Sequence, residues 1–234
     1  MVGKTREEAV RTRTQIIEAA RRVFSRQGVA GTTLDEVASA AGVTRGAIYW
    51  HFRNKRELFA EMRQQVTLPM MDRMAESLVE PAAGGHLAAL EQFLCSIMTC
   101  VTGDPRTRDT LRIMHFKCEY VTDLEEEYDR QVLRMVEMRR AVTAAYRRAA
   151  RAGELDAAIR PAVAATETTA FIIGLVRLAL MEEDAPVAGF QSVIRAHIAQ
   201  KRPSGVGQKN SSVNPQKPQP VKLQERRRQV RSPR

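Results

Sequence analysis

Long apolar runs and aromatic side chains are scarce in this sequence. Only 5% of its 234 residues are aromatic, although 44% are hydrophobic, and no run approaches the roughly eighteen apolar residues that a membrane-spanning helix needs. The N-terminal segment is charged throughout and no apolar stretch follows it, so the pattern does not predict a secretory signal peptide. We therefore expect a cytoplasmic protein with no membrane partner and with enough apolar content to build a core.

Cysteine is also scarce. Its three copies, Cys95, Cys100 and Cys118, are odd in number and lie in segments with a helical apolar pattern. We interpret them as small buried hydrophobic residues in a reducing compartment. A redox sensor is the alternative interpretation, but no basic residues cluster near Cys95 or Cys100 to lower the pKa of a thiol.

No set of residues typical of an enzyme stands out. The histidines are scattered, and no Gly-rich phosphate loop occurs between a strand and a helix. His115 and Glu119 are one helical turn apart with Cys118 between them, which leaves a metal site open as an alternative, although no second ligand cluster accompanies them. We expect no catalytic activity and no cofactor.

No segment alternates apolar and polar residues as a strand would, and apolar residues instead recur at helical spacing. The predicted fold class is all-α. Pro69 either kinks the fourth helix or ends it. In the long helix at 124–151, the residues expected to face inward are Leu133, Val136, Ala141 and Tyr146. The helices are expected at residues 5–27, 33–41, 44–51, 55–79, 87–101, 106–121, 124–151, 161–181 and 189–200.

The first expected helix has an apolar face and a basic face. The apolar face holds Ile16, Ile17, Ala20, Val23 and Phe24, and the residues that lie largely opposite are Arg11, Arg13, Arg21 and Arg22. The apolar residues should cover the inner faces of the next two helices. Together the three helices predict a compact head at residues 1–54.

The stretch from Thr33 to Phe52 predicts two short helices joined by a tight turn. Thr33 and Glu36 have the spacing of a capping box, Gly42 stands where a left-handed residue ends a helix, and Thr44 can cap the second helix. That second helix is too short to be stable alone, so it must dock on its neighbours. This is the pattern of a helix-turn-helix at residues 33–52.

The second short helix carries groups suited to duplex DNA. Ile48 and Phe52 share one face and can anchor the helix, which leaves its other faces available. An arginine can bind guanine in the major groove and a glycine allows close approach, while hydroxyl, imidazole and ammonium groups can bind phosphates. The predicted DNA-binding residues are Thr33, Thr44, Arg45, Gly46, Tyr49, His51 and Lys55. A small helical subdomain with ordinary solvated cations is the alternative.

The net charge of +10 is unevenly distributed. Residues 1–60 carry +5, residues 203–234 carry +7 and the remainder carries −2, which fits a protein that meets a polyanion at one end. The segment 203–234 has too few apolar residues to offset the entropy lost on ordering, so we expect a disordered tail. It is either a solvated basic extension or a source of non-specific phosphate contacts.

The stretches TREEAVRTRTQIIEAARRVFSRQG and TTLDEVASAAGVTRGAIYWHFRNKRELF, with the shorter HFKCEYV later, resemble the TetR family of bacterial transcriptional repressors, in particular its AcrR-like multidrug-efflux branch. The resemblance implies a homodimer on a palindromic double-stranded DNA operator, released by a hydrophobic small-molecule inducer. It also implies a helical ligand-binding and dimerisation domain at 55–202. The dimer interface would be formed by the helices at about 161–181 and 189–200, which are also more apolar than one chain requires.

Body helices rich in Met, Leu, Phe and Cys could enclose the inducer pocket, although each such residue could equally be plain core. The pocket itself is inferred chiefly from the resemblance. Because this branch takes up hydrophobic, often cationic or aromatic compounds, Glu119 is the acid expected to meet a cation. The candidate ligand-binding residues are Met62, Val66, Met70, Phe93, Ile97, Leu111, Met114, His115, Cys118, Glu119, Met135, Met138 and Phe171.

Two other functions remain open. A regulator of a metabolic operon, for lipids or terpenoids, would share the DNA-binding head and differ in its ligand. A ligand-independent adaptor would use the helical body for protein contacts instead.

Overall fold

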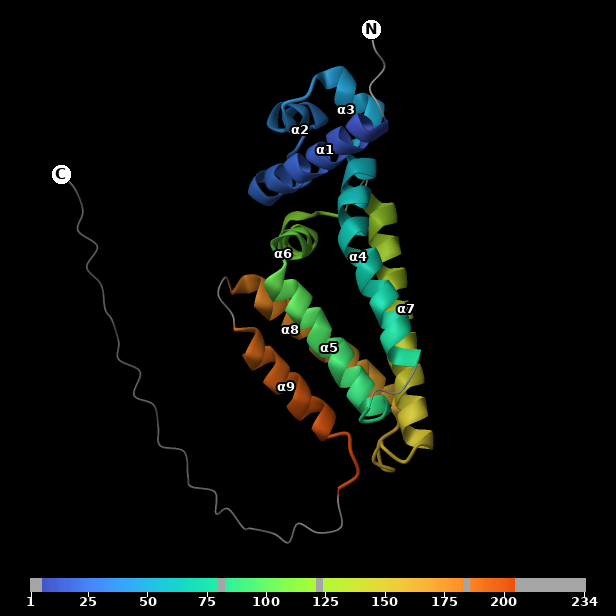
Figure 1. Cartoon of the computed structure of the whole chain (residues 1–234). Helices are drawn as coiled ribbons and strands as arrows, with labels where there is room; N and C mark the ends of the chain where they lie inside the picture. The colour runs from blue at the N-terminus through green and yellow to red at the C-terminus, as the bar shows by residue number, and fades with distance from the viewer. Residues whose placement is uncertain (1–5, 80–82, 121–123, 183–185, 205–234) are drawn as a thin grey trace, which may run out of the picture. The chain divides into compact units, whose positions relative to one another are not determined.

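The computed structural model describes residues 6–79, 83–120, 124–182 and 186–204, without the side chains of residues 70, 71 and 73–76. In these ranges all extended regular elements are helical, which confirms the predicted all-α class. Most of the predicted tail lies outside the described residues. The elements are α1 (Arg6–Gln27), α2 (Leu34–Ala41), α3 (Arg45–His51), α4 (Lys55–Val79), α5 (His86–Gly103), α6 (Pro105–Arg112), the π-helix η1 (Ile113–Lys117), α7 (Glu125–Arg151), α8 (Pro161–Met181) and α9 (Val187–Ala199) (Figure 1).

The three N-terminal helices pack around a small apolar core. α1 packs along α2, and α2 contacts α3 (Figure 1). A side chain of α1 also binds the end of α2, because Gln15 Nε2 donates to the Ala41 carbonyl oxygen at 2.6 Å. The centre of this core consists of five fully buried residues: Ile16, Ala20, Phe24, Val37 and Ile48.

The predicted caps of the two short helices are present. Thr33 Oγ1 accepts from the Glu36 N–H at 3.2 Å, and Glu36 Oε2 accepts from the Thr33 N–H at 2.8 Å, so the capping box closes in both directions. Gly42 ends α2 with a φ of +66°, a conformation that costs glycine little. Thr44 Oγ1 accepts from the Ala47 N–H at 3.2 Å at the start of α3. These local contacts fix the turn of the helix-turn-helix.

α4 runs from the head into the body without a break. It begins at Asn54, whose Oδ1 accepts from the Glu57 N–H at 2.9 Å, and it continues through Pro69, which therefore does not end the helix. Its Phe59 ring meets the Phe24 ring of α1 edge-on, with 6.3 Å between the centroids. Further along, α4 packs on α5 and α7. One continuous helix thus joins the two predicted domains.

The body is built around α5. This helix contacts α4, α7, α8 and α9, while α8 packs mainly on α7 (Figure 1). α8 and α9 meet through His197, whose ring stacks on Phe171 at 4.2 Å and whose Nε2 is 2.8 Å from Thr168 Oγ1. The buried apolar residues form a single cluster from Ile16 in the head to Ile198 in α9. The predicted domain boundary at residue 54 is therefore not marked by a gap in the core.

α8 is long and apolar enough to cross a membrane if only length and composition are considered, with a mean hydropathy of 1.6 over its most apolar window. Core helices of soluble proteins meet the same criterion. Here Ala164, Ala165 and Leu180 of α8 are fully buried. Packing inside the chain accounts for part of this apolar surface, since 44% of the window is buried.

Three sequence-based expectations need correction. The helix expected at 106–121 is α-helical only to Arg112, passes through η1 and reaches extended backbone at Cys118. Arg21 was expected opposite the apolar face of α1, but it is only 4% exposed because α6 packs there. Leu133 was expected to face inward and is 61% exposed.

Candidate functional site

The outward face of α3 is the first candidate site. Ile48 and Phe52 are buried and hold the helix to the head, as predicted. On the other side the Arg45 side chain is 74% exposed, and a Cβ on Gly46 would meet no atom within 4 Å. The face therefore presents a cation beside backbone that another molecule can approach closely. Such a face can enter a DNA groove.

Arg45 has two neighbours that affect its availability. Its Nε lies 3.3 Å from Asp35 Oδ1 of α2, and its guanidinium carbon lies 5.7 Å from the centre of the Tyr49 ring, one turn further along α3. The Asp35 carboxylate offsets part of the positive charge. Because both side chains of the ion pair are at least half exposed, water screens it and the pair can open toward a phosphate or base.

Trp50 was missed in the sequence analysis, although it is the most exposed large hydrophobic residue, at 73%, in the described part of the chain. It follows Tyr49, which is 45% exposed, on the same short helix. The signal was available, since Ile48 and Phe52 define the inward face and Trp50 lies off it. An exposed indole can bind sugars, thymine methyl groups or phosphates, so it belongs to the candidate surface.

The other predicted DNA-binding residues are placed differently from one another. Thr33 and Thr44 are exposed at the starts of α2 and α3, where their hydroxyl groups act as caps. Lys55 is half-buried and its Nζ donates to the Ala30 carbonyl oxygen at 2.9 Å, so it holds the loop before α2. His51 is a correction: its side chain is only 9% exposed and its ring packs edge-on against Trp50. We therefore leave His51 out of the candidate surface.

Arg13, expected only as part of the basic face of α1, positions the end of α3. Its guanidinium carbon lies 4.3 Å from the centre of the Phe52 ring, and Nη1 donates to the His51 carbonyl oxygen at 2.8 Å. Its Nη2 also binds Glu61 of α4 at 3.1 Å. One side chain of α1 therefore connects the C-terminal end of α3 to α4.

The body contains a second candidate site, an apolar cavity of about 320 Å³. This is at the lower end of the range of roughly 300–1,000 Å³ found for small-molecule pockets. Residues of α4, α5, α6, η1, α7 and α8 form its walls. The lining residues are Thr67, Phe93, Ile97, Leu111, Met114, His115, Gln131, Arg134, Met135, Met138, Ile172, Ile173 and Val176.

Seven predicted ligand-binding residues line this cavity: Phe93, Ile97, Leu111, Met114, His115, Met135 and Met138. Met62 and Val66 are buried in the core instead, and Phe171 stacks on His197. The side chain of Met70 lies outside what the structure describes. The prediction that Glu119 meets a cationic ligand is wrong for this cavity, since Glu119 is exposed and is not among the lining residues.

At and beside the cavity, the pKa values of His115 and Cys118 are shifted in the direction that favours the neutral form of each side chain. Burial, and secondarily the charge of Arg177, lowers the pKa of His115 from its ordinary value, so the imidazole is neutral near pH 7. The neighbouring Cys118 is not a lining residue, and burial raises the pKa of its thiol to about 11. A protonated thiol is a poor nucleophile, which speaks against the redox-sensor interpretation for this cysteine.

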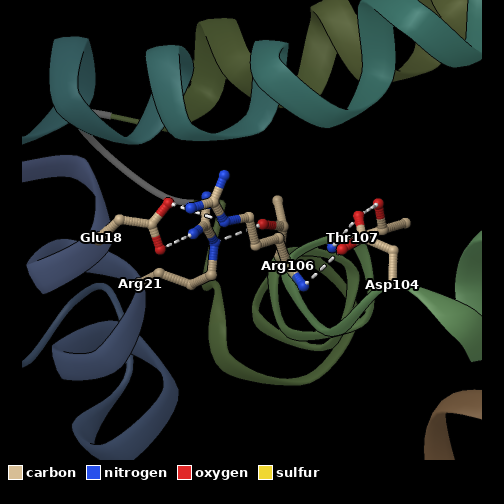
Figure 2. A network of polar contacts seen from close by, with 6 residues as sticks. Glu18, Arg21, Asp104, Arg106 and Thr107 are labelled. Carbon is tan, nitrogen blue, oxygen red and sulfur yellow. Dashed lines mark hydrogen bonds and ion pairs between the residues drawn. The ribbon is translucent and has the colours of Figure 1, made fainter. Parts of the chain in front are cut away.

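A polar network connects the head to α6. Figure 2 shows Glu18 and Arg21 of α1 reaching toward Arg106 and its neighbours on α6. Arg21 forms an ion pair with Glu18 and donates from Nε to Thr110 Oγ1 at 2.9 Å, while Arg106 Nε lies 3.3 Å from Glu18 Oε1. Asp104 caps α6, and the hydrogen bond from the Thr107 side chain, with smaller contributions from backbone N–H groups, lowers its pKa.

A backbone hydrogen bond also connects the head to η1. The Val29 N–H, just after α1, donates to the Lys117 carbonyl oxygen at 2.9 Å. Gly28 makes this approach possible, because its φ is +80° and a Cβ there would lie 3.2 Å from the same oxygen. Since Met114 and His115 of η1 line the cavity, a single five-residue segment contacts both the cavity and the head.

Comparisons with known proteins match both parts of the chain. Residues 16–62 match the family described as bacterial regulatory proteins, tetR family, and residues 85–186 match the C-terminal region of MAATS-type transcriptional repressors. The transcriptional regulator TtgR of Pseudomonas putida is 38% identical over 185 residues, covering 79% of this chain and 88% of TtgR. AcrR of Shigella flexneri is 38% identical over 124 residues, covering 53% of this chain and 57% of AcrR.

A solved structure agrees with these sequence matches. NalD, described as the secondary repressor of the MexAB-OprM multidrug efflux pump in Pseudomonas aeruginosa, superposes with a TM-score of 0.74 at 28% sequence identity. The match covers 86% of this chain and 100% of NalD. The fold of this chain is therefore shared with a solved repressor structure.

Proposed function

Because the chain belongs to the TetR family of bacterial transcriptional regulators, we propose that its dimer binds a palindromic operator through α3 and releases it when an apolar molecule fills the cavity. The chain is a ligand-responsive transcriptional repressor and not an enzyme. The solved structures that it resembles include two described as repressors of multidrug efflux pumps, NalD and SmeT. We propose that the controlled operon likewise encodes an efflux pump, and that the protein acts in the cytoplasm.

The exposed face of α3 carries the operator proposal. In this proposal Arg45 reaches a guanine, Gly46 admits the sugar-phosphate backbone, and Tyr49 and Trp50 pack against the groove wall. Thr33 and Thr44 lie at helix N-termini, where free N–H groups attract phosphates. Two such helices in a two-fold dimer would read half-sites separated by whole turns of DNA.

The two connections between cavity and head support release by a ligand. A ligand that displaces Met114 or His115 pushes on η1, whose Lys117 carbonyl oxygen binds the head at Val29. Displacement of α6 is transmitted through Thr110 and Arg106 to α1. For release, the ligand must bind the displaced arrangement more tightly than the operator-binding one, because equal affinity for both would shift nothing.

Fluorescence anisotropy with DNA from the promoter regions around the gene tests this proposal. We expect tight, salt-dependent binding to one palindromic site and weak binding to a scrambled duplex of the same composition. Apolar compounds, added singly from a panel of dyes and antibiotics, should lower operator affinity. Parallel titrations with acyl-CoAs test the alternative that the protein regulates a metabolic operon. Binding without sequence preference, or an operator complex that no compound weakens, would contradict the proposal.

The dimer is proposed to form through α8 and α9. Several apolar residues of these two helices are buried within one chain, among them Ala164, Ile172 and Ile194. Leu178 of α8 and Val193 of α9 remain 51% and 47% exposed. A line of exposed residues follows α8, with small side chains at its middle that would let a partner helix approach: Val163, Ala170, Gly174, Leu178 and Met181. This line supports a helix-to-helix interface.

Leu178→Glu should separate the dimer. The substitution would place two unpaired carboxylates in a two-fold interface, so we expect the dimer dissociation constant to rise by at least about a hundredfold. Light scattering coupled to gel filtration measures this directly. Leu133→Glu is the matched control, because Leu133 is similarly exposed but lies on α7. If the control dissociates and Leu178→Glu does not, the interface lies elsewhere.

A further inference from the structure

Apart from His115 of η1, the polar residues that line the cavity belong to α4 and α7 and lie at the end of the cavity where these two helices meet. Thr67 of α4 and Gln131 and Arg134 of α7 all line it. Gln131 and Arg134 are three residues apart, so they share a face of α7 with the apolar lining residues Met135 and Met138. α4 packs directly on α7, which brings Thr67 to the same end. α4 and α7 thus both supply polar groups to this end of the cavity.

The polar atoms at this end lack partners. Thr67 Oγ1, Gln131 Oε1 and Arg134 Nη2 are buried, and none has a hydrogen-bond partner among the described residues. Buried polar atoms are normally hydrogen-bonded, because an unpaired one loses its bonds to water and gains none in return. Three unpaired atoms in the wall of one cavity therefore point to a molecule that occupies it and completes their hydrogen bonds.

The charge balance around this end favours an anion. The nearest buried carboxylate, Glu127, is one turn before Gln131 and already serves two arginines: its Oε2 lies 2.7 Å from Arg63 Nη2 and its Oε1 lies 2.5 Å from Arg130 Nη1. Glu126 pairs with Arg56 and, at 3.7 Å, with Arg130. No ion pair of Arg134 is found within the part of the chain that the structure describes. Its guanidinium is thus an excess positive charge at the cavity wall.

Burial and a neighbouring cation further favour an anion beside Arg134. Burial, and next the charge of Arg63, lowers the pKa of its guanidinium from the ordinary value. The shift reflects the cost of holding a partly desolvated cation near another cation, a cost that a bound anion would relieve. The neutral state of His115 means that it does not compete for the anion.

We propose that the cavity selects apolar weak acids, that is, molecules with a largely apolar body and one carboxylate or acidic phenol. The acid oxygens accept hydrogen bonds from Arg134 Nη2 and Thr67 Oγ1. An ionised acid has no hydrogen to donate to Gln131 Oε1, so the Gln131 amide would turn over and donate from Nε2 to the acid. The apolar body fills the space between Phe93, Met138 and Ile172. This ligand class depends on the proposed function, since it specifies which molecules release the operator.

Three probes that share one apolar body test the ligand class on the full chain: naphthylacetate, its uncharged amide naphthylacetamide, and naphthylethylammonium. Calorimetric titration should give the acetate about tenfold tighter binding than the amide, as expected for one charge-assisted hydrogen bond. The ammonium should bind more weakly than both. Arg134→Met should remove the preference for the acetate while it leaves amide binding within about threefold.

Arg139→Gln is the matched control, because it removes an exposed arginine from the same helix, and it should leave the order of the three probes unchanged. Equal or tighter binding of the ammonium, no binding of any probe, or an acetate preference that survives Arg134→Met would each overturn the ligand class. Operator affinity without probe, and its loss with any compound of the wider panel, tests the proposed function separately. Failure of one is therefore distinguishable from failure of the other.

Discussion

Glu127→Gln is expected to lower the free energy of unfolding by about 3–5 kcal/mol. Glu127 is fully buried and its two carboxylate oxygens face Arg63, which is 1% exposed, and Arg130. An amide keeps the shape but not the charge, and its NH₂ group would face a guanidinium. The charge of Arg63 would then remain buried without a counter-ion. Urea denaturation at fixed protein concentration, followed by far-UV circular dichroism, measures the change.

Two further variants isolate the cause. Glu126→Gln alters the neighbouring carboxylate, which is 62% exposed, and should cost less than about 1 kcal/mol. Replacing both members of the buried pair, with Arg63→Met and Glu127→Leu together, should recover much of the loss, since a buried ion pair is often no more stabilising than apolar residues of similar size. If Glu127→Gln lowered the free energy of unfolding no more than Glu126→Gln does, the Arg63–Glu127 pair would add little to stability.

Arg45→Ala should weaken operator binding by about 1–3 kcal/mol if Arg45 reads a guanine. In that case the loss appears on the operator and is small on a scrambled duplex. If Arg45 binds only a phosphate, affinity should fall on both duplexes and the salt slope should drop by about 1. Anisotropy titrations at several salt concentrations distinguish the two, and unchanged affinity on both would rule out a DNA contact.

Asp35→Asn, next to Arg45, should change operator affinity in the opposite direction. The Asp35 carboxylate lies 3.3 Å from Arg45 Nε and would face the DNA phosphates, so its removal should tighten binding severalfold, most clearly at low salt. Arg147→Ala, which removes an exposed arginine of α7, should leave operator affinity unchanged. The pair of opposite shifts at Asp35 and Arg45 would be hard to obtain from a change in stability.

The head could be predicted in detail because its signals are local. The capping box at Thr33, the left-handed Gly42 and the cap at Thr44 each involve residues within four positions of one another, and all three have the expected geometry. His51 and Trp50 were the exceptions. Adjacent residues on a two-turn helix point in different directions, and only the docking angle of α3 decides which ring is buried.

The cavity could be predicted only in part because it depends on contacts between distant segments. Composition pointed to Met, Leu and Phe and so found part of the apolar lining. It missed the α8 wall of Ile172, Ile173 and Val176, and it overlooked the polar residues Thr67, Gln131 and Arg134. On α7, the expected inward residue Leu133 is exposed, whereas Gln131 and Arg134 on either side of it line the cavity. α7 packs on α4, α5 and α8 at once, and a single apolar stripe cannot reveal where several partners lie.

The bond between Val29 and Lys117 has a practical consequence for variants of this protein. His115 and Lys117 are separated by one residue, so a change in η1 alters the shape of the cavity and the seating of the head together. We therefore expect substitutions there to change the response to ligand and the basal level of repression together. A selection for new inducers that accepts changes at residues 113–117 will also return leaky or over-tight repressors, whereas changes at Phe93 or Met138 should be free of that side effect.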